Sequence, residues 1–583
     1  MKSRDDSRTV RPLPWPCDAE LTLPGAKSEA NRVLVAAALC GRAVTVTGAT
    51  PSDDVRHLVG GLRALGFAAH WLDESRGIVQ VGPRAEPLPA AAELFCGNAG
   101  TALRFLVSVA AITPGTWTIT GDAGMQRRPI GALVDAWCRL GVAIEATNGC
   151  PPVRVAGAAV TGGRVMLDAS ISSQFVSSLL LVGAQLPAGL DIAFTGPIAS
   201  APYAQLTCDV LHRFGVPATL RPDGASVRSG DGTAPAEFAV HGDWSAMGVW
   251  TCLEFLTGSH VRARNLRAGS GQPDEHLADT LRGLDGAGDR SLDVAALPDQ
   301  FLNLAIVAAL RPGTTQLVGA ANLRHKECDR LAVMARELRR VGVTVHELPD
   351  GLAIDGARSL HAARIDPAAD HRVAMAFALL GLVSAGITIA DPDCVTKSYP
   401  AFWHDVQTVH DSLRCVAVVG MRGAGKSTFA RALAERAGCT WVDTDEHFEA
   451  QFGPIARFVA EHGWPAFRRE EARLVAASLA PARVVSTGGG AIEHPATRAL
   501  LAARTLVIWL DGEADLLRAR LRLDARPRPS VTGADPALEI DELLARREPL
   551  YAAAANARLD AALPTALQIE RALPLLRANR RRP

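Results

Sequence analysis

At residues 415–428 the chain reads CVAVVGMRGAGKST, and this stretch determines the architecture of the residues after it. Its first five residues are apolar and predict a buried strand, and the alanine-rich sequence after it predicts a helix. Between them stands a full GxxxxGK[ST] loop, whose glycines let backbone N–H groups curl around phosphate while the lysine reaches the β- and γ-phosphates. The sequence therefore predicts a parallel α/β domain that binds ATP or GTP through Gly423, Ala424, Gly425, Lys426, Ser427 and Thr428.

Five further motifs follow this loop in order. They are WVDTDEHFE at 441–449, FRREE at 467–471, VVSTGGGAI at 484–492, LRLDARPRPSVTG at 521–533 and ARREPLY at 545–551. An ordinary charged surface explains any one of them. Taken together and in this order, the motifs resemble those of the shikimate kinase family.

The resemblance implies a role for individual residues of the C-terminal part. Shikimate would be held by Asp445, Arg468, Gly489, Gly490 and Arg547. Mg²⁺ would lie near Ser427 and Asp443, and ATP would be the co-substrate, with Lys426 as a catalytic cation. The family's lid reads Arg-Pro-Leu-Leu, where this chain has Arg526-Pro-Arg528-Pro-Ser-Val. Either arginine fits, and Arg528 is favoured as the catalytic, ATP-covering residue because Thr532 and Gly533 follow at the usual spacing.

The first 400 or so residues contain a repeated pattern. A helix-like segment ends in glycine and is followed by a β-branched strand in RALGFAAHW at Gly66, CRLGVAIEA at Gly141, HRFGVPATL at Gly215 and RRVGVTVHE at Gly342, with a weaker copy at Gly286. The first three glycines are 75 and 74 residues apart. One such helix end is common, but regular spacing predicts repeated α/β units.

Lysine is rare in this chain. Of 61 Lys plus Arg residues, only five are lysines: Lys2, Lys27, Lys326, Lys397 and Lys426. Arginine is a rigid, permanently charged fork, whereas lysine is a compact point charge on a thin stem. The last four lysines are therefore candidate active-site residues, at places where arginine would not fit.

Polar clusters accompany the first three of these candidates. They are GNAGTALR at 97–104, RRPI at 127–130, SSQF at 172–175, SAPY at 200–203, PDQ at 298–300 and DHR at 370–372. Cations spread over many loops, with Ser and Gln beside them, favour a cleft for two anionic substrates. Together these motifs resemble the EPSP synthase (3-phosphoshikimate 1-carboxyvinyltransferase) family from about residue 12 to residue 411.

This second resemblance implies an α/β fold of six repeats in two lobes, like an inside-out α/β barrel, with a cleft that closes on substrate. We expect one lobe to comprise residues 1–24 and 244–411, and the other residues 25–243. The kinase-like domain would then follow as residues 412–583.

The same resemblance implies two sets of substrate contacts. Shikimate 3-phosphate would be bound by Lys27, Ser28, Arg32, Ser172, Ser173, Gln174, Ser200, Asp299, Asn322 and Lys326. Phosphoenolpyruvate would be bound by Lys27, Asn98, Gly100, Arg128, Gln174, Arg330, Arg372 and Lys397, with Thr101 shaping the same pocket. The chain departs from the family pattern at Ala26, Gly124 and Ala201, where Ser or a basic residue often stands.

The implied chemistry adds the 5-hydroxyl of one substrate to the enol ether carbon of the other and then expels phosphate. Such a step needs a base, an acid and positive charge on the leaving group. Asp299 and Glu327 are the acid/base candidates, with Lys27 assisting.

Several alternatives stay open at this point. A UDP-sugar enolpyruvyl transferase would carry a cysteine between residues 121 and 130, and this chain has none there. The C-terminal domain could act on gluconate or a nucleotide, or serve only as a nucleotide-binding regulatory module. The pairing of Asp445 with Arg468 and Arg547 favours chemistry on a small hydroxy acid.

Composition limits the other classes of function. Acidic and basic residues balance at 61 each, which gives no basic field for nucleic acid. Eleven scattered cysteines without CxxC pairs favour a reducing, cytoplasmic compartment. Residues 373–390 lack charge, yet Gly381, Gly386 and a β-branched end predict a buried helix and strand rather than a membrane span. We expect a cytoplasmic monomer that acts on small molecules and binds no membrane.

Overall fold

The computed structural model describes residues 7–85, 88–230, 232–523, 530–531, 535 and 538–578. Arg526, Arg528, Thr532 and Gly533, on which the lid prediction rests, lie outside these residues. The chain divides into two compact units. The first comprises Met1–Pro12, Leu21–Leu253 and Ala263–Trp403, and the second comprises Leu13–Glu20, Glu254–Arg262 and His404–Pro583.

Four sheets of the first unit share one strand arrangement. In each, an edge strand runs parallel to a central strand, and an antiparallel hairpin completes the sheet. The sheets, in strand order, are β14 (Glu237–Ala239), β3 (Val44–Thr47), β5 (Ile78–Arg84) and β4 (Phe67–Asp73); β6 (Ala91–Phe95), β7 (Gly115–Thr120), β9 (Cys150–Gly157) and β8 (Ala143–Thr147); β10 (Gly163–Leu167), β11 (Leu190–Phe194), β13 (Gly224–Val227) and β12 (Ala218–Arg221); and β16 (Arg290–Asp293), β17 (Thr314–Val318), β19 (Gly351–Asp355) and β18 (Thr344–Leu348).

The glycine pattern marks these units correctly in four of five places. The helices α2 (Asp53–Ala64), α4 (Gly131–Arg139), α6 (Ala201–Arg213) and α10 (Arg330–Arg340) each precede a glycine with φ between 75° and 91°. Each glycine leads into the first strand of a hairpin, because it adopts a left-handed conformation that closes the helix cheaply. The weaker copy at Gly286 differs, since α8 (Leu277–Arg282) leads to the edge strand β16 instead.

The predicted mixed α/β fold is confirmed, and the sheets are open ones. Strands β1 (Arg8–Thr9), β21 (Ile387–Ile389) and β20 (Ala363–Ile365) form a smaller sheet, and β2 (Asp18–Leu21) pairs with β15 (His260–Ala263). Among the described strands, none closes a sheet into a barrel. The repeats are thus separate sheets, each covered by helices.

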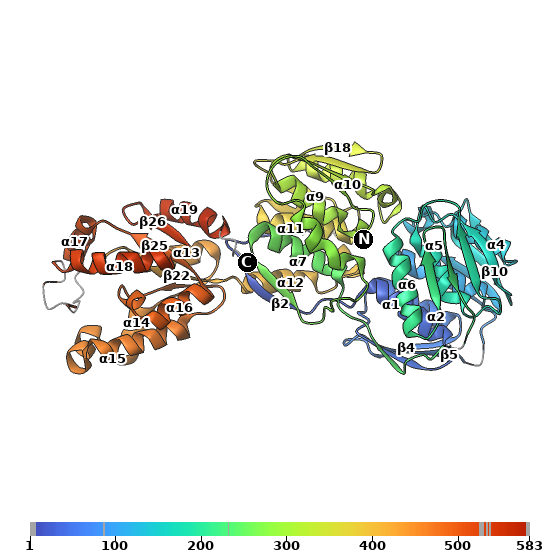
Figure 1. The fold of residues 1–583 in the computed structure, drawn as a ribbon, viewed down its shortest axis with the longest axis horizontal. Coiled ribbons are helices and arrows are strands. Elements are labelled where there is room, and N and C mark those ends of the chain that lie inside the picture. The colour runs from blue at the N-terminus through green and yellow to red at the C-terminus, as the bar shows by residue number, and fades with distance from the viewer. Residues whose placement is uncertain are drawn as a thin grey trace. The chain divides into compact units, whose positions relative to one another are not determined.

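Three helices fill the interior of the segment at residues 25–243. They are α1 (Lys27–Leu39), α3 (Gly100–Ala111) and α5 (Ser173–Gly183), which pack on one another and on α2 and α6 (Figure 1). All three are buried over most of their length, including polar residues such as Asn31, Arg104 and Ser178, and one continuous apolar cluster runs from Ala26 to Val240. Burying these helices leaves only their ends to meet solvent or a ligand.

The rest of the first unit is built in the same way. Helices α7 (Trp244–Thr257), α9 (Phe301–Leu310) and α11 (His371–Val383) are largely buried. Helix α12 (Phe402–Asp411) follows, and most of it belongs to the second unit. The uncharged stretch at 373–390 forms α11 and then the buried strand β21, as the two glycines predict. Within the described residues, no helix combines the length and apolarity needed to cross a membrane.

The second unit contains a parallel five-stranded sheet (Figure 1, orange to red). Its strand order is β23 (Thr440–Asp443), β24 (Arg483–Ser486), β22 (Cys415–Val419), β25 (Thr505–Asp511) and β26 (Ala557–Asp560). The helices are α13 (Lys426–Ala437), α14 (Thr444–Phe452), α15 (Ile455–Ser478), α16 (Pro495–Arg504), α17 (Ala514–Leu523), α18 (Ile540–Ala554) and α19 (Thr565–Ala578). The central strand β22 is buried throughout, as its apolar sequence predicts, and α15 is kinked at Gly463.

Candidate functional sites

The glycine-rich loop joins the end of β22 to the start of α13. Gly423 and Gly425 have φ values of 81° and 90°, which L-residues with a Cβ rarely adopt. The loop therefore wraps around the N-terminus of α13, where backbone N–H groups and the helix dipole favour a phosphate. The Nζ of Lys426 lies within this loop and donates a hydrogen bond to the Met421 carbonyl at 3.0 Å.

An oxygen pair lies beside the loop. The Ser427 hydroxyl donates to Oδ2 of Asp443 at 2.5 Å. Oδ1 of Asp443 caps α14 by accepting from the backbone N–H groups of Asp445 and Glu446, so the carboxylate is fixed. A hydroxyl and a carboxylate held together suit Mg²⁺, which takes few protein ligands besides phosphate oxygens.

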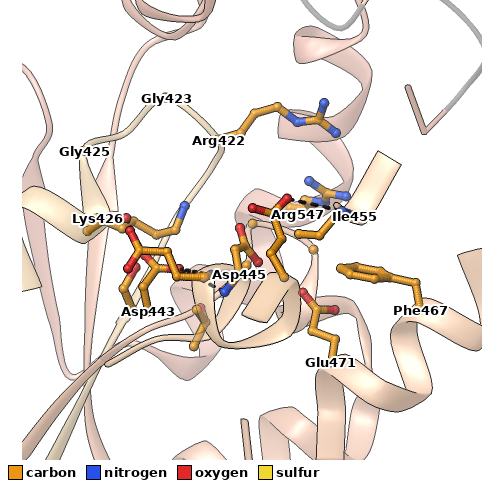
Figure 2. Close-up of a pocket in the computed structure, with 18 of the residues that line it drawn as sticks. Arg422, Gly423, Gly425, Lys426, Asp443, Asp445, Ile455, Phe467, Glu471 and Arg547 are labelled. Carbon is orange, nitrogen blue, oxygen red and sulfur yellow. Dashed lines mark hydrogen bonds between the residues drawn. The ribbon is translucent and has the colours of Figure 1, made fainter. Parts of the chain in front are cut away.

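The other end of the same pocket gathers charges from three more elements. Arg468 on α15 donates to Glu471 at 2.6 Å, and Arg547 on α18 lies 3.2 Å from Glu493. Figure 2 shows Asp445 between Lys426 on one side and Glu471 and Arg547 on the other, with Asp443 on the same side as Lys426. A cation-lined end opposite the phosphate loop is suited to a small carboxylate with hydroxyls.

The glycines at 488–490 are needed for this geometry. A Cβ on Gly490 would run into the guanidinium of Arg468, and one on Gly488 would meet the carboxylates of Asp445 and Glu471. The Tyr551 hydroxyl donates to the Gly489 carbonyl and holds the backbone of residues 488–490 in place. The backbone can thus approach a ligand closely at this point.

Glu471 is a strongly perturbed carboxyl of this pocket. Burial raises its pKa to about 7, and the nearby charge of Asp445 adds to the effect, while Arg468 opposes it. Its Oε1 is buried without a hydrogen-bond partner in the described structure. The Glu471 carboxyl therefore changes its charge near neutral pH, and only its ionised form makes an ion pair with Arg468.

The cleft of the first unit is formed where several helices begin. Lys27 and Ser28 start α1, Gly100 and Thr101 start α3, and Ser172 caps α5. The helices α6, α10 and α11 also begin at the cleft, which Ser200 at the N-cap of α6, Arg330 at the start of α10 and Arg372 in the first turn of α11 line. Because each N-terminus carries a partial positive charge, their convergence favours a highly charged anion.

Lysines and arginines add full charges, and carboxylates hold most of them in place. Lys27 lies 2.9 Å from Asp54, and Lys397 lies 2.7 Å from Glu327. Arg330 contacts Glu327 at 2.9 Å, Asp370 at 2.8 Å and Asp299 at 3.4 Å, and Arg372 contacts Asp299 at 2.8 Å. The two acid/base candidates thus each lie against two cations.

Arg32 differs from these cations because its bonds are to neutral acceptors. It is 2% exposed and donates to Thr207, Ser177 and the carbonyls of Ser28 and Tyr203. Burial lowers the pKa of Arg32 to about 10. A buried cation without a carboxylate among its bonded partners is suited to meet the charge of an anionic ligand.

These contacts shift the pKa values of the central groups. Burial would raise the pKa of Asp299, but Arg372, Lys326 and Arg330 outweigh it and hold the pKa below its ordinary value. The pKa of Glu327 is likewise held well below its ordinary value, because Lys397, Arg330 and Arg128 outweigh burial. Burial lowers the pKa of Lys326 to about 8. Both carboxyls are therefore ionised in the free cleft.

One side of the cleft is held by a separate hydrogen-bond chain. Arg104 donates to Oε1 of Gln174 at 2.9 Å, and the Gln174 amide donates to Thr101 at 2.9 Å. Arg128 lies 3.3 Å from Oδ1 of Asn98. A Cβ on Gly100 would come within 2.7 Å of the guanidinium groups of Arg104 and Arg128. Only glycine lets both arginines pack against the start of α3.

The structure brings most of the sequence-predicted residues together. In the first unit, all of them line one cleft except Asn98 and Lys397, which contact its lining residues Arg128 and Glu327. In the second unit, the predicted residues line one pocket except Ala424, which stands in the loop, and Arg528, which lies outside the described residues.

Several lining residues were not predicted from the sequence. They are Asp54, Tyr203, Asp243 and Ser245 in the first unit, and Arg422, Trp464, Glu471 and Arg520 in the second. Tyr203 belongs to the SAPY cluster and Glu471 ends the FRREE motif, so both had a local signal. Asp54 and Ser245 had none, because only the fold brings them to the cleft.

Two family models match successive parts of the chain. Residues 14–406 match the family model of EPSP synthase (3-phosphoshikimate 1-carboxyvinyltransferase), and residues 422–573 match that of shikimate kinase. A 3-phosphoshikimate 1-carboxyvinyltransferase of Rhizobium etli is 36% identical over 421 residues, which cover 70% of this chain and 98% of that protein.

A longer relative matches both parts at once. The pentafunctional AROM polypeptide of Kluyveromyces lactis is 32% identical over 558 residues, which cover 82% of this chain and 35% of that polypeptide. This chain thus spans about a third of the length of that relative. An EPSP synthase structure from Acinetobacter baumannii matches with a TM-score of 0.57 at 24% identity, covering 69% of this chain and 98% of that one, which shows the fold. This chain belongs to the EPSP synthase family and carries a shikimate kinase domain at 422–573, after the part that matches that family.

Proposed function

We propose that this chain catalyses two consecutive reactions on one carbon skeleton. Its C-terminal domain, residues 412–583, phosphorylates shikimate with ATP to give shikimate 3-phosphate. Its N-terminal domain, with lobes at 1–24 plus 244–411 and at 25–243, transfers the enolpyruvyl group of phosphoenolpyruvate to the 5-hydroxyl and releases phosphate. The observation that carries the proposal is the pairing of a phosphate-binding loop with a small-acid pocket in one unit, and of a cation-lined anion cleft in the other.

In the kinase domain, the loop residues 423–428 would hold the ATP phosphates and Lys426 would stabilise charge on the transferred group. Asp445 would receive the attacking hydroxyl, while Arg468, Arg547 and the glycines at 489–490 would hold the carboxylate and ring of shikimate. The proposed lid residue Arg528 stays a sequence prediction. Ser427 and Asp443 would hold Mg²⁺, which neutralises charge on the ATP phosphates when bound.

In the transferase domain, the starts of α1, α5 and α6 would hold shikimate 3-phosphate. The contacts are Lys27, Ser28, Arg32, Ser172, Ser173, Gln174, Ser200, Asp299, Asn322 and Lys326. Phosphoenolpyruvate would be held by Lys27, Asn98, Gly100, Arg128, Gln174, Arg330, Arg372 and Lys397. Gln174 belongs to both sets, in keeping with its place at the junction of α3 and α5.

The two carboxyls would divide the proton transfers. Asp299 would take the proton of the 5-hydroxyl, and Glu327 would protonate the methylene carbon, with Lys27 assisting. In the free cleft, the pKa of Glu327 is held low by Lys397, Arg330 and Arg128 despite its burial. Bound phosphate and carboxylate groups would offset those cations, so substrate binding would raise the pKa of Glu327 and prepare it as an acid.

A coupled assay tests both activities. Shikimate, ATP, Mg²⁺ and phosphoenolpyruvate are supplied together, and 5-enolpyruvylshikimate 3-phosphate, ADP and phosphate are followed. We expect ADP formation to depend on shikimate, and product formation to depend on all four additions. ATP binding without shikimate-dependent ADP formation would instead support a regulatory role for the C-terminal domain. The proposed cytoplasmic, monomeric state is tested separately by sedimentation and fractionation.

The kinase pocket yields a prediction on pH. Glu471, with its pKa raised by burial to about 7, is ionised above that pH and protonated below it. Only the ionised form holds Arg468 by a full ion pair at 2.6 Å. The KM for shikimate should therefore rise as the pH falls through about 7, and in Glu471→Gln it should be raised at all pH values and lose this dependence.

Glu470→Gln provides the matched control, since Glu470 is the preceding residue of α15 and pairs with Arg473 at 2.7 Å. It should keep the wild-type pH profile for shikimate. A Glu471→Gln enzyme whose KM still rises on acidification would show that another group is responsible.

A further inference from the structure

Five side chains form a closed hydrogen-bonded ring at the base of the transferase cleft. Arg372 donates from Nη2 to Oδ2 of Asp299 at 2.8 Å and to the Ser245 hydroxyl at 3.1 Å. Ser245 donates to Oδ2 of Asp274 at 3.0 Å. The Tyr203 hydroxyl lies 3.0 Å from Oδ2 of Asp274 and 3.1 Å from Oδ2 of Asp299. The ring thus joins the cleft carboxylate Asp299 to a second carboxylate.

The ring has five contacts but only four protons when both carboxylates are ionised. Arg372 supplies two protons and Ser245 supplies one. Tyr203 has a single hydroxyl proton for two carboxylate oxygens. One contact is therefore left without a proton, and a single added proton on Asp274 would complete it, because Asp274 could then donate to Tyr203 while Tyr203 donates to Asp299.

The surroundings of Asp274 allow it to take this proton. It lies in the 3-10 helix η2 (Pro273–His276), is 4% exposed and does not line the cleft. Its Oδ1 accepts from the Gln300 amide at 3.0 Å. Burial and the charges of Asp299 and Asp243 raise its pKa to about 6, while Arg372 opposes them. No lysine forms an ion pair with Asp274 among the described residues.

We propose that Asp274 is a positioning residue of the transferase that accepts, through the Tyr203 hydroxyl, the proton that Asp299 removes from the substrate. The inference rests on the proposed transferase function. Asp299 would pass the proton to the Tyr203 oxygen as Tyr203 gives its own proton to Oδ2 of Asp274. The ring then gains one proton in total, the heavy atoms stay in place, and Asp299 is again ionised beside Arg372 and Arg330.

The wild-type enzyme gives the first test. Above the pKa of Asp274, one contact of the ring lacks a proton and Asp274 can accept one. Below that pKa, Asp274 is already protonated and can accept no further proton. The transferase kcat should therefore fall on acidification with a midpoint at a pH of about 6, while the KM values change little. A kcat that stays constant through this range would overturn the proposal without any variant.

Asp274→Asn supplies the second test, because an amide has nearly the same shape and cannot take up the proton. We expect the transferase kcat to fall at least ~10-fold at neutral pH, as for loss of a proton-transfer group, and the acid limb to disappear. The KM for shikimate 3-phosphate should stay within about twofold. A rise in KM with unchanged kcat would instead indicate a purely structural role and would overturn the proposal.

Controls come from the same chain. Asp279→Asn on the neighbouring helix α8 removes an exposed carboxylate that pairs with Arg282 and should leave the transferase kcat and its acid limb unchanged. The kinase activity of each variant reports on folding of the other unit. Tyr203→Phe should lower the transferase kcat as Asp274→Asn does, since it removes the connection between the carboxylates.

An infrared titration does not require turnover. The titration is done in a Glu471→Gln background, which removes the kinase-pocket carboxyl whose pKa is raised to about 7. In that background a protonated carboxyl component should grow as the pH falls through about 6, persist when Tyr203→Phe is added and be missing when Asp274→Asn is added. If this component appears but the wild type shows no transfer of the enolpyruvyl group, the proposed function fails and the protonation of Asp274 stands. If the component is unchanged when Asp274→Asn is added, the inference fails whatever the activity.

Discussion

Lys426→Met should abolish shikimate-dependent ADP formation and leave enolpyruvyl transfer from added shikimate 3-phosphate unchanged. The lysine stands at the start of α13, and its Nζ lies inside the phosphate loop. Methionine keeps an unbranched side chain only one atom shorter and removes the charge that would stabilise the transferred phosphoryl group. Loss of one such charge costs on the order of 10²–10³-fold in kcat, which places the residual rate near the background of the assay.

The matched control is Arg436→Met, which removes an exposed cation from the same helix far along it from the loop. Its kinase activity should equal that of the wild type. ATP binding, followed by equilibrium titration, should be weakened in Lys426→Met alone. If Lys426→Met retained substantial kinase activity, the phosphate-binding role of this loop would be refuted, and a regulatory role for the domain would have to be reconsidered.

The sequence predicted those features that depend on a few neighbouring residues. The phosphate loop is one, because two positive φ values at Gly423 and Gly425 and one helix start define it locally. The four repeat units marked by Gly66, Gly141, Gly215 and Gly342 are another. The copy at Gly286 shows what this pattern cannot predict. A glycine at a helix end indicates that a strand follows, but it does not indicate with which strand the new one pairs.

The ring around Asp274 could not be predicted in this way. Its members stand at positions 203, 245, 274, 299 and 372, on five different helices. No spacing rule links them, and Asp274 stands outside the polar clusters that drew attention to the cleft. Family resemblance supplied Asp299 as an implied substrate contact, whereas a residue that acts through another has no motif of its own.

Three of the rare lysines of the first unit lie close together in the structure. Lys27, Lys326 and Lys397 all lie in the cleft or against a residue that lines it, and two of them form ion pairs with a single carboxylate oxygen. Lys27 and Lys397 therefore each leave the second carboxylate oxygen of their partner able to accept a hydrogen bond from another group. At Glu327 that second oxygen accepts from Arg330, and at Asp54 it is buried without a partner in the described structure.

The second carboxylate oxygen of Asp54 makes the Lys27 position sensitive to a charge-conserving exchange. Lys27→Arg should lose most transferase activity although the charge is kept. The Nζ of Lys27 lies 2.9 Å from Oδ2 of Asp54, and Oδ1 of Asp54 has no partner in the described structure. A guanidinium would engage both oxygens as a fork, which turns the charge toward Asp54 and away from the cleft. Misplacing a group by about 1 Å costs ~10²-fold, so we expect a loss of this order in kcat.

The control must make a charge-conserving exchange on the same lobe. Arg56→Lys does so on the exposed face of α2, where Arg56 pairs with Glu74 at 2.7 Å, and it should have wild-type transferase activity. Kinase activity should be normal in both variants, because the second unit is untouched. The double variant Lys27→Arg with Asp54→Ala separates two causes. Partial recovery of transferase activity would show that Asp54 holds the introduced guanidinium away from the cleft. A larger loss of activity would show that Asp54 orders the cleft in another way, and would count against this explanation. Turnover near the wild-type rate in Lys27→Arg itself would refute it, since the position would then need only a positive charge.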